Sequence, residues 1–467
     1  MKLPIYTRAH VSALNQKLQE SAEDILRRDP QISYKGLLAE AHLQIPELLS
    51  DDGNSPPALK QVEHDILNTL GEVGLPKVQQ FLSTGQIPTP GLLDGFHLNI
   101  WGAGSCGLSL AYLFSCHGAE VVLNERRGKN NFLEACSRTP NISWKRFRET
   151  MRSVLSEKDF SQLDDSIMEH GGVIDPISQK LRSSIGGFQE ALYKQVAQKG
   201  VDIRLGREVS PKRLGDSKNF DIQVVCTGVH AAEQIPGNDL ELFSFPDGIG
   251  KIFITTTMYP TDRDTGFYRV EWEENQDVPP HGPVSWRRKN INVQPINIFR
   301  NEIERFIFNL EKKGSRLSDI QKARSLLNES QIAHVFYFGN QTPSYHHDVG
   351  SEQYPCLTEK ISIGSWMLAR SISFDDKNGP VAFLGDATGG AHPLAAIGAY
   401  LSFKNSVDLL KHCACLHNLK SIAHKIPHDS YSTLTKKILY WTEYKMILDR
   451  LMVFLQARLC AHYSRLE

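Results

Sequence analysis

Apolar residues recur along the chain at two different spacings, which predict different elements. In residues 11–18 and 59–70 they return every three or four positions, as on one face of a helix. Short apolar runs of strand length occupy residues 96–101, 120–124, 201–205 and 221–226. Helical patterns separate these runs, and strands that alternate with helices are typical of a parallel sheet in an α/β protein.

The pattern changes after residue 232. Residues 251–258 and 266–272 are rich in β-branched and aromatic side chains, and residues 334–338 are strand-like again. A helical pattern covers about 297–329, and a last apolar strand at 381–384 is followed by helices to about 461. We therefore expect an α/β fold, α+β overall. Its predicted parts are a helical N-terminal extension (1–93), a discontinuous α/β domain (94–232 and 360–467) and a β-rich insertion (233–359).

Composition narrows the class of protein. Lys plus Arg number 52 and Asp plus Glu number 53, so the net charge is −1. A nearly neutral chain gives no electrostatic reason to expect nucleic acid as a partner. The sequence contains neither the apolar core of a signal peptide nor a transmembrane segment. Its eight cysteines lack C-x-x-C spacing, which favours reduced thiols in a cytoplasmic protein.

The turn after the first strand carries three glycines at the spacing of a dinucleotide site. Gly102 permits the tight turn, Gly104 lets a pyrophosphate approach the backbone, and Gly107 allows the following helix to pack on the strand. Ser105 and Cys106 begin that helix, whose free N–H groups and dipole favour phosphate. A preceding strand and a following helix supply the context that this motif requires.

The second strand ends in an acidic residue. Glu125 is placed to accept hydrogen bonds from the ribose hydroxyls of an adenosine, and its charge disfavours a 2′-phosphate there. Arg126 and Arg127 follow it. They either reach the adenosine or phosphates of the ligand or form a solvated charge pair.

A second strand-to-turn junction lies far along the chain. Gly385 and Asp386 follow the strand at 381–384, and the Asp is placed to bind a ribityl hydroxyl. The next helix is expected to begin near Ala396, with Gly398 and Ala399 at its start, and its N-terminus would stabilise negative charge on a flavin ring. Together with the glycine turn, this junction favours FAD over NAD. Near the ring we expect the candidate catalytic residues His392 and Pro393, although His392 also fits a solvent-facing turn.

These paired motifs resemble the FAD-dependent monooxygenases of the aromatic-hydroxylase (group A) class. The acid-Arg pair matches Glu125 and Arg126, and the late motif matches residues 385–387, Pro393 and Gly398. Residues 102–108 look most like the MICAL-type monooxygenases, and Gln189 matches their helix before the third strand. The resemblance implies a Rossmann-type FAD-binding domain with an inserted β-sheet substrate domain. It also implies NADPH or NADH as electron donor.

The chain departs from the family at three places. The family's Arg before Gln189 is Gly186 here, and its Asp-Gly motif reads Cys226-Thr227-Gly228, of which we assign only Gly228 to cofactor binding. The late helix start has also lost one glycine. These departures concern NADPH use more than FAD binding.

Three functions remain open from the sequence. The first is an FAD-dependent monooxygenase that uses NAD(P)H and O₂ on a small organic molecule or a protein side chain. The second is an FAD-dependent dehydrogenase, reductase or oxidase of the same fold. The third is a non-catalytic FAD-containing interaction protein, with a protein partner bound through residues 1–93. The His and Cys residues at 412–417 fit no standard zinc spacing, so no metal site is expected.

Overall fold

The structure is a computed structural model of the 467-residue chain. It describes residues 16, 20–21, 23–25, 27–29, 59–84, 91–128, 144–170, 172–174, 181–183, 185–215, 219–228, 239–244, 251–260, 268–271, 290–293, 311, 317–325, 330–338, 356–362, 365–369, 372–375, 379–388 and 398–463.

Six strands form the central sheet in the order β14-β15-β6-β1-β2-β5. Their bounds are β1 His97–Trp101, β2 Glu120–Glu125, β5 Asp202–Leu205, β6 Ile222–Val225, β14 Ile372–Asp375 and β15 Gly379–Phe383. All neighbours are parallel except β14 and β15. In chain order, β2 and β5 are added on one side of β1, and β6 is then added on the other side. Open α/β sheets bind their ligands beyond the carboxyl ends of the strands at such a reversal, which here lies between β1 and β6.

The two faces of the central strands bury different side chains, because successive residues of a strand point to opposite faces. Leu98 and Ile100 join the large core cluster that includes α5 (Ser105–Cys116). Trp101 joins a smaller cluster with Leu214 of α10 (Pro211–Gly215). The sheet is therefore covered on both faces, as a parallel sheet must be.

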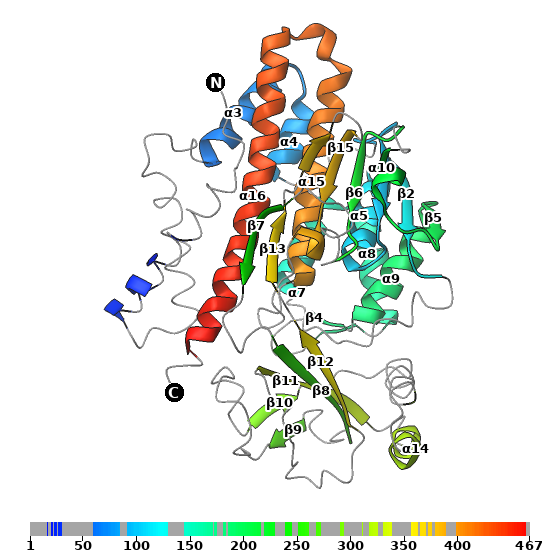
Figure 1. Ribbon diagram of the computed structural model, residues 1–467. Coiled ribbons are helices and arrows are strands. Elements are labelled where there is room, and N and C mark those ends of the chain that lie inside the picture. Colours follow the sequence, from blue (N-terminus) through cyan, green and yellow to red (C-terminus); the bar gives the residue numbers. More distant parts are fainter. Residues whose placement is uncertain are drawn as a thin grey trace.

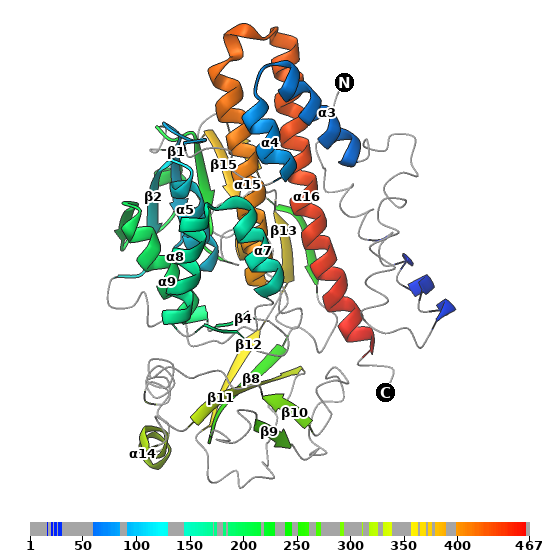
Figure 2. The ribbon, with the colours of Figure 1, turned by 180° about the vertical axis from the view of Figure 1, so that it is seen from behind.

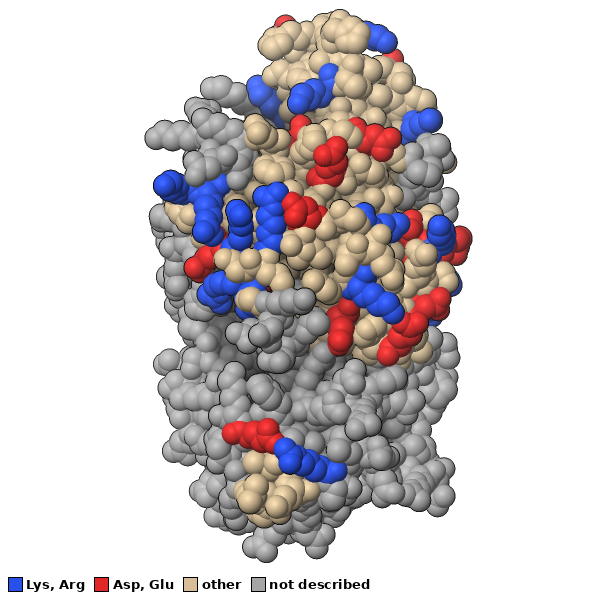
Figure 3. All heavy atoms as spheres, turned by 90° about the vertical axis from the view of Figure 1, so that its right-hand side faces the viewer, with Lys and Arg blue, Asp and Glu red and all other residues tan. Residues whose placement is uncertain are grey.

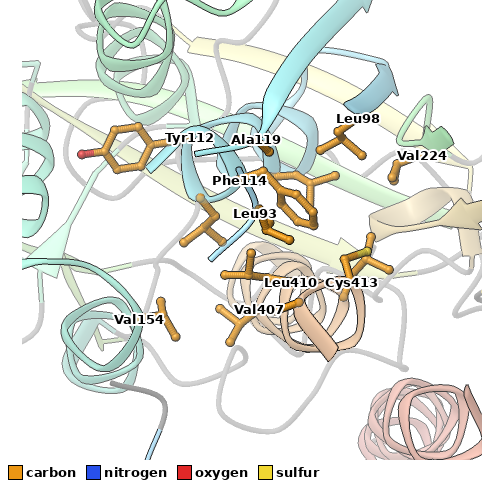
Figure 4. Packing of buried hydrophobic residues seen from close by; sticks show 14 of the residues in the cluster. Leu93, Leu98, Tyr112, Phe114, Ala119, Val154, Val224, Val407, Leu410 and Cys413 are labelled. Atoms are coloured by element: carbon orange, nitrogen blue, oxygen red, sulfur yellow. The ribbon is translucent and has the colours of Figure 1, made fainter. Parts of the chain in front are cut away.

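Helices form a thick layer beside α5. The helix α15 (Gly398–Ser421) packs on α5, and α16 (His428–Tyr463) returns along α15 after a short 3₁₀ turn, η3 (Ala423–Lys425). Figure 4 shows Phe114 of α5 facing Leu410 and Cys413 of α15, with Leu93 between them. The helices α7 (Trp144–Val154), α8 (Glu157–Glu169) and α9 (Ile185–Gln198) complete the layer.

The predicted N-terminal helices are confirmed for residues 59–84. The helix α3 (Leu59–Glu72) packs on α16, and α4 (Pro76–Thr84) packs on α15 (Figure 2). Lys437 of α16 forms an ion pair of 2.8 Å with Asp65 of α3. Lys411 of α15 donates to the Leu82 carbonyl of α4 at 3.4 Å. These helices therefore share the core of the sheet domain.

Antiparallel strands make up the segment between β6 and β14. The largest group is the sheet β11-β8-β12, which lies at the opposite end of the molecule from the α15–α16 turn (Figure 1). The bounds of the elements in this segment are β7 Asp239–Ser244, β8 Lys251–Pro260, β9 Tyr268–Glu271, β10 Asn290–Val293, α14 Leu317–Ser325, β11 Ser330–Phe338, β12 Cys356–Ser362 and β13 Ser365–Ala369. The short strands β3 (Val173–Ile174) and β4 (Leu181–Arg182) pair earlier in the chain.

Most of the residues that the structure describes between 233 and 359 lie in strands, and α14 falls within the predicted helical stretch of about 297–329. The strand β7 at 239–244 pairs with β13 at 365–369, which the sequence pattern did not show. The three domain boundaries stay predictions. Among the helices described, none is long and apolar enough to cross a membrane.

Candidate functional site

The glycine turn has the geometry that its spacing predicts. Gly102 has a φ of +103°, and a Cβ there would lie 2.5 Å from the Cys226 carbonyl oxygen. A Cβ on Gly107 would overlap the Gly102 carbonyl oxygen. Gly104, by contrast, has nothing within 4 Å of a built Cβ, and no side chain caps the helix that it begins. Two glycines thus let backbones meet, and the third leaves open space at uncapped helix N–H groups.

Glu125 is held at the end of β2 by hydrogen bonds on both carboxylate oxygens. The Ala103 amide donates to Oε2 at 2.8 Å, and the amide and Nε of Arg127 both donate to Oε1 at 2.9 Å. Burial alone raises the pKa of this carboxyl, but the hydrogen bonds from Arg127 and Ala103 outweigh burial and lower it. Glu125 is therefore ionised at neutral pH, 5% exposed, and fixed to the glycine turn.

The late turn arrives at the same place as the glycine turn. Gly385 has a φ of +63°, and a built Cβ would lie 3.1 Å from the Cys106 Cβ and 3.3 Å from the Ser402 Oγ. Gly385 and Asp386 form a 3₁₀ turn that follows β15, and Asp386 is exposed. The two predicted motifs, almost 280 residues apart in the sequence, therefore meet across the first turn of α5.

Cys226 brings a thiol into this junction. It follows β6, and its Sγ donates to the Cys106 Sγ over 3.7 Å. The hydrogen bond to Cys106 and burial raise the pKa of the Cys226 thiol well above its ordinary value. The Cys106 Sγ also lies 4.0 Å from the Ser402 carbonyl oxygen and from the Ser406 Oγ. Three strand ends and α15 thus converge around Cys106.

Some of the remaining predicted residues lie near the glycine turn, and others lie outside the residues that the structure describes. Gln189 of α9 donates to the Ser105 Oγ at 3.2 Å, which places it at the start of α5. Gly228 has a φ of +83° two residues beyond Cys226. Gly398 and Ala399 are the first two residues of α15. His392 and Pro393 lie outside the described residues.

The two arginines after β2 behave differently. Arg127 pairs with Glu125, and its side chain is only 25% exposed. Arg126 is 67% exposed and lies 3.7 Å from Glu208, a loose surface pair of small energetic value. On the face at the right-hand side of Figure 1, Lys and Arg side chains gather over part of the surface and mix with Asp and Glu elsewhere (Figure 3). Arg126 is therefore an exposed charge that a ligand could recruit.

A buried network of amides supports the site, and the sequence analysis missed it. Asn99 of β1 donates to the Gln223 Oε1 of β6 at 3.1 Å, and Trp101 Nε1 donates to the same oxygen at 3.3 Å. Asn124 of β2 donates to the Asn99 Oδ1 at 2.7 Å, and its carbonyl accepts from the Gly102 amide at 2.7 Å. Amides inside apolar strands were the signal that could have found this network.

No group of three or more His, Cys, Asp or Glu residues is arranged for a metal ion within the part of the chain that the structure describes. The His and Cys residues at 412–417 lie on α15. His412 is buried and its Nδ1 lies 3.0 Å from the Thr442 Oγ1, while His417 Nε2 lies 3.0 Å from the Asp94 carbonyl oxygen. Burial raises the pKa values of the Cys413 and Cys415 thiols.

No family model matches the chain. No curated protein matches it either. Solved structures that resemble it at low identity include a mutant of PqsL from P. aeruginosa, at 13% identity and a TM-score of 0.42, with 80% of this chain and 100% of that chain covered. A mutant of 2-methyl-3-hydroxypyridine-5-carboxylic acid oxygenase has 14% identity, a TM-score of 0.43 and coverage of 73% and 86%. The flavin-dependent monooxygenase PieE, in complex with FAD and substrate, has 13% identity, a TM-score of 0.42 and coverage of 80% and 72%. TM-scores this low do not establish a shared fold, and we infer nothing about this chain from them.

Proposed function

We propose that this chain is an FAD-dependent oxidoreductase, and that it acts as a monooxygenase with NAD(P)H and O₂. One observation carries the proposal: the turn at Gly385 and Asp386 meets the glycine turn at Cys106, with a built Gly385 Cβ 3.1 Å from the Cys106 Cβ. An adenine dinucleotide bound only at the glycine turn needs no such second turn. A flavin dinucleotide extends beyond its pyrophosphate through a ribityl chain, which a carboxylate at Asp386 suits.

The residues present fit the adenosine half of FAD. The open space at Gly104 and the uncapped N–H groups of α5 suit the diphosphate. The ionised Glu125 suits the ribose hydroxyls, and the partly exposed Arg127 guanidinium is the group that a hydroxyl would replace. The Ala103 amide keeps the carboxylate in place during that exchange, because it donates to Oε2 from the turn itself.

The proposed site for the flavin half of FAD is formed by elements near the end of the chain. When bound, FAD supplies the hydride-accepting and oxygen-activating chemistry. The chain's part is to bind and orient it: Asp386 as an acceptor for the ribityl chain, and the N-terminus of α15 at Gly398 as a positive dipole end. His392 and Pro393 stay candidate residues near the ring. The substrate is a small organic molecule or a protein side chain, such as the methionine that MICAL-type enzymes oxidise.

The first test is the visible spectrum of the purified full chain, followed anaerobically with NADPH and then with NADH. We expect a yellow protein whose flavin absorbance is bleached by one nucleotide and recovers when oxygen is admitted. Transfer of ¹⁸O from O₂ to a product then defines a monooxygenase. A colourless protein that cannot be reconstituted with FAD would overturn the proposal.

Two glycine variants separate cofactor binding from folding. Gly104→Val fills the open space at the glycine turn, whereas Gly128→Val fills an equally open position on the surface loop after β2. Both should unfold at the same urea concentration as the parent chain. Only Gly104→Val should lose FAD affinity, by about a hundredfold or more, because its side chain takes the place of the diphosphate. Equal FAD binding by the two variants would place the cofactor elsewhere.

The second candidate is an FAD-dependent dehydrogenase, reductase or oxidase. The observation that favours it is Cys226-Thr227-Gly228, which stands where the monooxygenases carry Asp-Gly. In that case the flavin would be reduced by an organic donor, and ¹⁸O would not enter the product. A yellow protein that no donor reduces would instead favour the non-catalytic interaction protein, with residues 1–93 as the proposed surface for its partner.

A further inference from the structure

Cys106 and Cys226 are two thiols that face each other beside the glycine turn. They are 120 positions apart in the sequence, and their sulfur atoms are 3.7 Å apart. Cys106 lies in the first turn of α5, and Cys226 lies just beyond β6. The pair therefore connects α5, the helix proposed to bind the diphosphate, with the end of β6.

The other described cysteines do not make such a pair. Cys413 and Cys415 are two positions apart on α15, so their side chains leave the helix in different directions. Cys116 lies at the far end of α5, where burial raises the pKa of its thiol to about 12. Among the five cysteines that the structure describes, only Cys106 and Cys226 have sulfur atoms in contact.

Cys226 is also the more accessible of the two. Cys106 is buried, whereas Cys226 is partly exposed. Its backbone carbonyl carbon would lie 2.8 Å from a Cβ on Gly102, so the chain at Cys226 rests against the glycine turn. The thiol itself is buried beside Cys106, so an oxidant has to be small to react there, and a movement of residue 226 displaces the glycine turn.

We propose that Cys106 and Cys226 form a reversible redox site, at which a peroxide oxidises the two thiols to a disulfide that weakens FAD binding. One thiolate attacks the peroxide, the O–O bond breaks, and a sulfenic acid and one water form. The second sulfur then attacks the sulfenic sulfur and releases a second water. Two thiols lose two electrons and two protons, and hydrogen peroxide becomes two waters. The part of the proposal that concerns FAD rests on the proposed function.

The effect on FAD follows from how tightly Cys106 is packed. The sulfur atoms must move from 3.7 Å apart to about 2.05 Å. A Cβ added at Gly385 would lie 3.1 Å from the Cys106 Cβ, so little free space remains on that side, and Gly107, the next residue of the helix, packs on the Gly102 carbonyl. A shift of Cys106 therefore moves the first turn of α5 relative to Gly102. Hydrogen bonds from that turn to a diphosphate weaken once donor and acceptor exceed about 3.2 Å.

The test uses the full chain, first reduced with dithiothreitol and then treated with hydrogen peroxide. The thiolate is the reacting form and the pKa of the Cys226 thiol is raised, so oxidation is run at an alkaline pH of about 9.5. We expect a mass loss of about 2 Da, a linked peptide that contains both cysteines, and a Kd for FAD that rises by about tenfold or more. Dithiothreitol should restore the mass and the affinity.

Two variants test whether the response to peroxide depends on the pair Cys106 and Cys226. Cys116→Ser should respond to peroxide like the parent chain, while Cys226→Ser should show neither the linked peptide nor any change of Kd with peroxide. The response to peroxide is compared within each variant, so a different starting affinity does not matter. Absence of the linked peptide in the parent chain overturns the proposal, and so does a disulfide without a change in Kd. A reduced chain that binds no FAD overturns the proposed function, while the mass measurement still decides whether the disulfide forms.

Discussion

Two regions of the molecule bury polar side chains in different ways. In the central sheet, Asn99, Asn124, Gln223 and Trp101 donate and accept among themselves and with the backbone. In the α15–α16 hairpin, three buried polar atoms have no hydrogen-bond partner among the residues described. They are Asn405 Oδ1, Asp408 Oδ2 and Trp441 Nε1.

The difference suggests that the sheet requires a fixed strand register, whereas the hairpin tolerates small shifts between its helices. A buried amide network whose members are paired resists any slip between strands, because a slip would leave its donors unpaired. In this sheet the network holds β6, β1 and β2 in register, so the glycine turn, Glu125 and Cys226 stay aligned. The hairpin is joined mainly by apolar packing and ion pairs such as Asp408 with Lys445 at 3.3 Å, with a buried contact of 3.0 Å between His412 and Thr442 rather than a connected network among the residues described. Apolar contacts tolerate small shifts that a cofactor site does not.

The largest expected effect falls on the sheet. Gly107→Ala should lower the free energy of unfolding by about 4 kcal/mol or more, because its Cβ overlaps the Gly102 carbonyl and the backbone must move. Urea unfolding followed by circular dichroism measures the loss. In the helical region, Gly71→Ala meets only the side-chain amide of Gln79 and should change stability by less than about 1 kcal/mol. Equal losses would remove the contrast between the regions.

Each region also buries a histidine, and both should make stability depend on pH. Burial lowers the pKa values of His117 and His412 to about 4. The unfolded chain takes up these protons near pH 6.5, so stability is complete above that pH and is lost as pH falls toward 4. Each histidine contributes up to about 3 kcal/mol of this loss.

The variant His412→Leu should remove the share of the hairpin histidine. Thr442 keeps its bond to the Ile438 carbonyl, so the substitution leaves that hydroxyl paired. Unfolding free energies measured at pH 7 and at pH 5 should then differ less than in the parent chain. An unchanged pH dependence would show that His412 is not buried in its neutral form.

A matched pair of asparagines tests the network directly. Asn99→Leu leaves the Asn124 amide and Gln223 with fewer partners and should cost about 2–3 kcal/mol, together with some FAD affinity. Asn405→Leu removes an oxygen that has no partner among the described residues and an amide that donates only to the Leu401 carbonyl of its own helix, so it should change stability by less than about 1 kcal/mol. Urea unfolding of both variants decides the matter. A larger loss in Asn405→Leu would contradict the comparison.

The smallest effect is expected at the surface of the hairpin. Asp65→Asn breaks the pair with Lys437, which joins α3 to α16 through partly exposed side chains. We expect a loss of about 0.3–1 kcal/mol that shrinks in high salt. Thermal unfolding at low and high ionic strength measures it. A salt-independent loss would mean that packing rather than charge is responsible.

Local chemistry predicted from the sequence agrees with much of the structure. The strand ends, the glycine turn and the position of Glu125 follow from hydrophobic spacing and backbone sterics. The predicted strands of the central sheet lie within two residues of their expected bounds, whereas β11 begins four residues before the predicted 334–338. The contact between Cys106 and Cys226, and the sharing of Gln223 by Asn99 and Trp101, depend on strand order and register. No local pattern encodes these, because they join residues more than 100 positions apart.

The packing of α3 and α4 on the last two helices has a consequence for synthesis on the ribosome. About 300 residues separate Thr84 from Gly398, where their packing partner begins. At a synthesis rate of about 5–20 residues per second, roughly 15–60 s pass before α15 begins to emerge and can cover the apolar face of these helices. Val62, Ile66 and Phe81, all buried in the finished protein, are exposed during that time. These early helices therefore expose apolar side chains that a chaperone could cover on the nascent chain.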